Sequence, residues 1–96
     1  MDEIIKNYHT AIERICDGFY NKASRIPPQK FNWNDNAFAW FGYLVKEGGK
    51  VLNKMQYELN SREFKALSRQ LQNIAEEEFE KLKLRIEAGA ANSKVG

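Results

Sequence analysis

Residues 5–19 read IKNYHTAIERICDGF, and their large apolar side chains recur at steps of three and four residues. On a helix this spacing forms one apolar stripe, which consists of Ile5, Tyr8, Ile12, Ile15 and Phe19. The acidic residues just before it suit the positive end of a helix dipole. Pro27 and Pro28 must end the helix, because the residue before a proline is pushed out of the α region. The sequence therefore predicts a first helix over residues 2–24.

The following segment concentrates the aromatic residues, with six rings in thirteen positions: Phe31, Trp33, Phe38, Trp40, Phe41 and Tyr43. Residues 25–36 are too rich in Pro, Asn and Asp for a helix, so we predict an ordered loop there. In an extended chain alternate side chains point the same way, which would place Phe31 and Trp33 on one side of this loop.

A second helix is predicted to start from a cap within residues 34–36 and to end at Glu47, because Gly48 and Gly49 can supply the positive φ that closes many helices. The run over residues 37–45 is apolar around most of a helix circumference, and a buried strand is the alternative interpretation. Such a helix must be covered by other helices or by another chain. If the other helices of a monomer leave it incompletely covered, we expect a homodimer that buries part of residues 37–45.

Two more helices complete the prediction. Residues 50–59 carry apolar side chains at helical spacing, and a bend is expected near residue 60. Asn60 and Glu63 are placed to form a capping box at the start of a last helix over residues 61–88. The inner face of that helix would comprise Phe64, Leu67, Leu71, Ile74, Ala75, Phe79, Leu82 and Ile86.

Together these segments predict an all-α fold: a compact bundle of about four helices, with long first and last helices that run roughly antiparallel around the apolar second helix. Residues 1–88 would form a single helical domain, and residues 89–96 a disordered tail. The single cysteine excludes an internal disulfide and favours a reducing compartment. The sequence begins without a signal-peptide pattern and has no membrane-spanning run, so we expect a cytoplasmic protein that does not bind membranes.

The sequence offers no convincing catalytic or metal site. His9 is the only histidine, and Cys16 lies two helical turns further along, a rise of about 10 Å that is too long for proton transfer between them. We therefore interpret His9 as an ordinary surface or boundary residue and Cys16 as a small buried hydrophobe. The sequence predicts no catalytic residue, no cofactor and no metal ligand, and hence no enzyme.

The densest carboxylate cluster lies in the last predicted helix, at Glu76, Glu77, Glu78 and Glu80. Consecutive helical residues point about 100° apart, so only Glu76 and Glu80 share a face, and two carboxylates without a third ligand make a weak site for calcium or magnesium. The cluster is interpreted as a solvated face.

Two rows of basic residues recur at helical spacing: Lys46, Lys50 and Lys54, and then Arg62, Lys65 and Arg69. Such rows can neutralise phosphates, so a small nucleic-acid-binding regulator is one function to consider. Against it, the net charge is only +2, and Glu47, Glu58 and Glu63 interrupt the positive field.

The aromatic residues favour a different function. Either all six rings are core, or Phe31 or Trp33 stands partly exposed beside Lys30 as an anchor for a partner. The sequence favours a non-enzymatic protein-interaction module: a small cytoplasmic adaptor, regulator or inhibitor that binds a larger protein with an acidic surface. Small inhibitors encoded by phages and mobile elements share this general character. The predicted partner-binding residues are Lys30, Phe31, Trp33, Arg62, Lys65 and Arg69. Nucleic-acid binding is the second hypothesis, and a self-associating structural subunit is the third.

Overall fold

The computed structural model describes the backbone of residues 2–95 and the side chains of residues 2–89. Within this part the chain forms three helices and no strand: α1 (Asp2–Ser24), α2 (Trp33–Met55) and α3 (Ser61–Val95). The predicted all-α class and the bounds of the first helix are confirmed. The predicted count of four helices is wrong, because the expected second and third helices are one.

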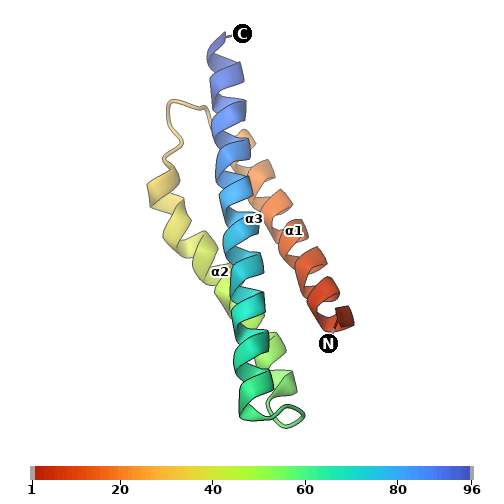
Figure 1. Cartoon of the computed structure of the whole chain (residues 1–96). Coiled ribbons are helices and arrows are strands. Elements are labelled where there is room, and N and C mark those ends of the chain that lie inside the picture. Colours follow the sequence, from red (N-terminus) through yellow and green to blue (C-terminus); the bar gives the residue numbers. More distant parts are fainter. Residues whose placement is uncertain (1, 96) are drawn as a thin grey trace.

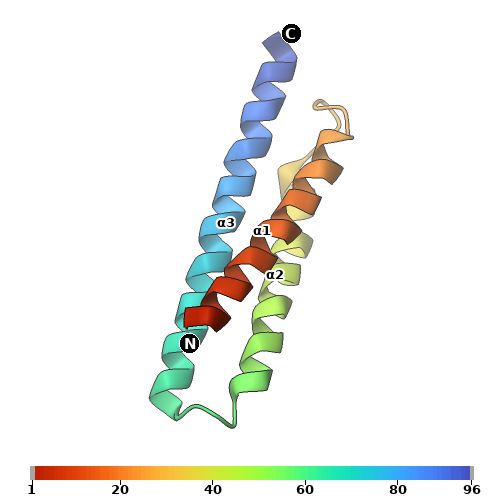
Figure 2. The same ribbon diagram turned by 90° about the vertical axis from the view of Figure 1, so that its right-hand side faces the viewer.

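The three helices run up, down and up along a molecule 53 Å long (Figure 1). Both views show that α1 and α3 point in the same direction and that α2 runs against them (Figure 2). The predicted antiparallel arrangement of the first and last helices is therefore wrong. With short connections every helix reverses the direction of the one before it, so a third helix returns to the direction of the first.

Gly48 and Gly49 do not end a helix but lie inside α2. No glycine in the described part of the chain has a positive φ. Gly48 is buried, and a Cβ atom placed there would lie 3.2 Å from the phenol oxygen of Tyr8. This glycine thus serves close packing of α1 on α2. The helix ends instead at Met55, where the amide of Glu58 donates to the Met55 carbonyl oxygen (3.0 Å).

The start of α2 lies earlier than predicted. Asn32 is its N-cap, and its side-chain oxygen accepts a hydrogen bond from the Asn34 amide (2.9 Å). The side-chain amide of Asn36 donates to the Asn32 carbonyl oxygen (2.9 Å). A cap within residues 34–36 is therefore wrong, and Trp33 is the first helical residue rather than part of an extended loop.

The predicted capping box at the start of α3 is confirmed. The Glu63 amide donates to the side-chain oxygen of Asn60 (2.8 Å), and the Asn60 amide donates to the Glu63 carboxylate (3.1 Å). α3 continues past the predicted end at residue 88 to Val95. The predicted disorder of residues 89–96 stays a prediction, because the side chains of residues 90–96 lie outside the described part.

The core joins the stripe of α1 to the inner faces of α2 and α3. Its most completely buried large side chains are Ile12, Leu44, Leu67 and Leu71. Each contributes roughly 1.5–3 kcal/mol of transfer free energy. Only Leu44 and Gly48 are buried in α2, so the outer face of this apolar helix is open. Within residues 2–95, no helix is both long and apolar enough to cross a membrane.

Candidate functional site

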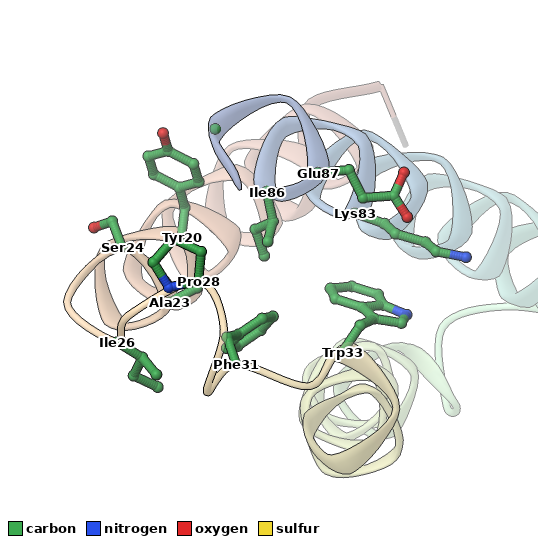
Figure 3. A pocket seen from close by; sticks show the side chains of 11 residues that line it. Tyr20, Ala23, Ser24, Ile26, Pro28, Phe31, Trp33, Lys83, Ile86 and Glu87 are labelled. Carbon is green, nitrogen blue, oxygen red and sulfur yellow. The ribbon is translucent and has the colours of Figure 1, made fainter. Parts of the chain in front are cut away.

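A cavity of about 320 Å³ lies beside the end of α1. We call it the aromatic cavity. It is lined by Tyr20, Ala23, Ser24, Ile26, Pro28, Phe31, Trp33, Lys83, Ile86, Glu87 and Gly89. Figure 3 shows Phe31, Trp33 and Ile86 facing the same space from the connecting segment, α2 and α3. The site thus draws on all three helices and on the connection between the first two.

A tight turn positions the cavity wall in the segment between α1 and α2. The amide of Ile26 donates to the Ala23 carbonyl oxygen (3.1 Å) at the end of α1. The amides of Lys30 and Phe31 then both donate to the Pro27 carbonyl oxygen, at 2.8 and 3.1 Å. Because proline fixes its own φ, this turn has few alternative conformations and holds Phe31 in place.

Phe31 and Trp33 are half-buried. Phe38 is 91% exposed and Tyr43 is 50% exposed, so the interpretation of all six rings as core is wrong. The Trp33 ring lies 4.9 Å from that of Phe79 and 6.2 Å from that of Trp40, centre to centre. Phe31 lies 6.0 Å from Trp40, which stacks on Phe19 at 4.7 Å. One face of each ring therefore packs toward the core, and both residues also line the cavity.

The surroundings of the aromatic cavity are mainly basic. Arg25 and Lys30 are exposed on the connecting segment, and no acidic residue occurs between Lys22 and Asn34. Among the described residues, Lys83 lines the cavity together with one carboxylate, that of Glu87.

The second group of predicted partner-binding residues lies elsewhere. Arg62, Lys65 and Arg69 border one shallow depression near the start of α3. A helix rises about 1.5 Å per residue, so Lys65 and Lys83 are separated by about 27 Å along α3. Figure 1 shows the start of α3 at the opposite end of the bundle from the connection between α1 and α2. The six predicted residues therefore form two separate surfaces, because the continuous helix α3 holds them apart.

A polar cluster that sequence reasoning missed joins α1 to α3. His9 Nε2 lies 2.7 Å from a Glu78 carboxylate oxygen and 3.2 Å from one of Glu13, and the Lys81 ammonium donates to Glu78 (3.3 Å). Glu78 is only 9% exposed, so its assignment to a solvated face is wrong. It faces α1 because it follows Ala75 by three residues and precedes Leu82 by four, which puts it on the buried stripe.

Among the residues whose side chains are described, His9, Glu13 and Glu78 form a group that could hold a metal ion, since one ligand atom from each lies within 4.8 Å of the others. The Lys81 ammonium already neutralises Glu78, however, and competes with a cation there. The cluster as it stands is a hydrogen-bonded link between two helices. Nearby, burial raises the pKa of the Cys16 thiol to about 11, with Glu78 and Asp17 adding to the effect. This thiol stays protonated near neutral pH and is a poor nucleophile.

Comparison with known proteins identifies no relative: no family model matches the chain, and neither a curated protein nor a solved structure shows significant similarity to it.

Proposed function

We propose that this chain is a non-enzymatic protein-interaction module, an adaptor, regulator or inhibitor that holds one apolar side chain of a larger protein in the aromatic cavity. The observation that carries the proposal is the cavity itself, about 320 Å³ in volume and walled by Tyr20, Phe31 and Trp33. Large rings around a concave site are typical of binding hot spots, because they exclude water from the buried contact.

The local structure of the wall supports tight binding. The turn closed on the Pro27 carbonyl oxygen holds Phe31, and contacts with Trp40 and Phe79 hold Trp33. Side chains that are already ordered lose little conformational entropy when a partner docks. More of the free energy of contact then remains as affinity.

The charges define the chemistry of the partner. Arg25 and Lys30 give the connecting segment a positive surface, with no acidic residue between Lys22 and Asn34. A partner with acidic residues around its apolar anchor would be steered toward this end of the bundle and would associate faster at low salt. We therefore expect a partner surface that combines a large apolar side chain with Asp or Glu.

Binding of nucleic acid through the basic rows is the competing function. Lys46, Lys50 and Lys54 are exposed on α2, and Lys50 is already paired with Glu47 (3.0 Å). A protein that binds phosphates through such rows loses affinity steeply as salt rises. An apolar anchor in a cavity leaves a salt-independent component, which separates the two functions.

Selection from a displayed library of random peptides on the immobilised chain tests the proposal. We expect the recovered peptides to share one large apolar residue flanked by acidic residues. A parallel titration with a labelled random-sequence oligonucleotide should give only weak, salt-sensitive binding. Recovery of peptides without a common apolar residue, or tight binding of the oligonucleotide at physiological salt, would contradict it.

A further inference from the structure

The outer face of α2 carries an apolar stripe that no other part of the described chain covers. Phe38 is 91% exposed and Val45 is 55% exposed. At Gly42 and Gly49, an added Cβ atom would meet nothing within 4 Å. These four positions follow one another at steps of four, three and four residues, so they lie along one side of the helix. We call them the α2 stripe.

A groove of about 280 Å³ lies beside the α2 stripe, between α2 and α3. Val45 and Gly49 belong to both the stripe and the groove, and Leu52, Ser68 and Gln72 supply other parts of its wall. A cavity of about 150 Å³ in another protein already holds a benzene molecule. The groove is therefore large enough for a phenyl ring.

We propose that a second copy of this chain covers the α2 stripe, with the two α2 helices packed antiparallel about a two-fold axis between residues 43 and 44. In this register Phe38 of one copy meets Gly49 of the second copy, and Val45 meets Gly42. Each large side chain thus faces a glycine, and each Phe38 ring enters the groove of the opposite copy.

With two-fold symmetry, the exposed Phe38 ring of each copy fills the groove of the other copy. Each chain supplies one exposed phenyl ring and one groove on the same helix, which is the self-complementary arrangement that a two-fold dimer requires. A head-to-tail contact would leave a free ring at one end and an empty groove at the other. The antiparallel dimer leaves neither.

The charges on α2 favour the same direction. Asp35 stands near the start of the helix, and Lys46, Lys50 and Lys54 stand toward its end. Antiparallel packing brings Asp35 of one copy alongside Lys50 of the second copy, whose ammonium also donates to Glu47 of its own chain (3.0 Å). Parallel packing would instead keep Asp35 of each copy at the opposite end of the contact from the lysines of the second copy, so this attraction would be absent. None of the stripe residues lines the aromatic cavity, so this dimer stands independently of the proposed function.

Sedimentation of the full chain over a range of concentrations tests the dimer. We expect Phe38→Ala to weaken dimerisation by about tenfold or more, as loss of a central aromatic contact does. Tyr57→Ala is the matched control, because Tyr57 is also 91% exposed but lies outside α2. Its variant should sediment like the wild type. A wild-type chain that stays monomeric at high micromolar concentration, or equal effects of the two variants, would overturn the proposal.

Two further comparisons test the register. Gly49→Leu should block the groove and abolish the dimer, whereas Gly18→Leu, at an equally open helical glycine of α1, should not. Asp35→Lys should weaken the dimer, and the double variant with Lys50→Asp should restore it. Circular dichroism checks that each variant remains helical. A dimer that survives Gly49→Leu, or a double variant that restores nothing, would contradict the antiparallel register.

Discussion

The phenol oxygen of Tyr8 lies 3.2 Å from the point that a Cβ atom would occupy at Gly48, and it is the nearest atom to that point outside the helix's own backbone. Both residues are buried, Tyr8 on α1 and Gly48 on α2. A side chain at residue 48 would have to push the tyrosine ring away. The close approach of these two helices therefore depends on a glycine in the middle of α2, where glycine is otherwise unfavourable.

Gly48→Ala tests this dependence. Replacing an exposed helical glycine with alanine stabilises a protein by roughly 0.5–1 kcal/mol, and Gly18→Ala, with open space around its Cβ, should show this gain. Gly48→Ala should gain less or become destabilising, because the contact with Tyr8 offsets the helix propensity. Urea denaturation of both variants at low protein concentration measures the difference. Equal stabilisation in the two variants would show that the packing does not require a glycine.

The polar cluster of His9, Glu78 and Lys81 predicts that Glu78 stabilises the fold and that its neighbour Glu77 does not. Glu78→Ala removes the partner of His9 and Lys81 and should lower the free energy of unfolding by about 1 kcal/mol or more. Glu77→Ala alters an exposed side chain and should stay within about 0.5 kcal/mol of the wild type. Chemical denaturation near neutral pH measures both. If both variants are as stable as the wild type, the cluster is not a stabilising link.

Two buried groups predict a loss of stability at high pH. Burial raises the pKa of Cys16 from 9.0 to about 11, and burial followed by Glu47 raises that of Tyr8 from 10.0 to about 12. In both cases the folded state favours the protonated form, so the stabilisation is complete below the unfolded pKa and is lost as pH rises through the folded one. Stability should therefore fall from about pH 9 to about pH 12.

Cys16→Ala isolates the contribution of the thiol, because alanine does not titrate. The variant should be less stable than the wild type near neutral pH through lost packing, but its stability should decline less steeply between pH 9 and pH 11. Denaturant midpoints across this range provide the measurement. Parallel curves for the two proteins would refute a raised thiol pKa.

Features set by neighbours in the sequence could be predicted, and features set by distant contacts could not. The apolar stripe predicted the helix α1, the acidic residues before it and the two prolines after it predicted its ends, and the spacing of Asn60 and Glu63 predicted their reciprocal hydrogen bonds. Gly48 was misinterpreted as a helix stop because its partner, Tyr8, lies forty residues away. A glycine pair can end a helix or admit a neighbouring ring, and the local sequence is the same in both cases.

The candidate site shows the same limit. Glu78 looked solvated among other glutamates, although its spacing from Ala75 and Leu82 was a usable signal of the buried stripe. The predicted anchors Phe31 and Trp33 do line a cavity, but its other walls come from α1 and α3. These walls come together only in the folded chain. Lys65 lies far from the cavity because α3 is one long continuous helix.

The central claim is that the aromatic cavity binds an apolar side chain of a partner. The most direct test compares two variants, Ile26→Asp and Leu84→Asp. The measured quantity is the dissociation constant of a peptide that was selected on this chain and combines acidic and apolar residues. Both residues are exposed and apolar, but Ile26 lines the aromatic cavity and Leu84 does not. Trp33→Ala is less informative, because Trp33 also packs against Phe79. Calorimetry should show binding weakened about tenfold or more by Ile26→Asp and unchanged by Leu84→Asp. Equal affinity of the two variants would contradict the assignment of the aromatic cavity as the binding site.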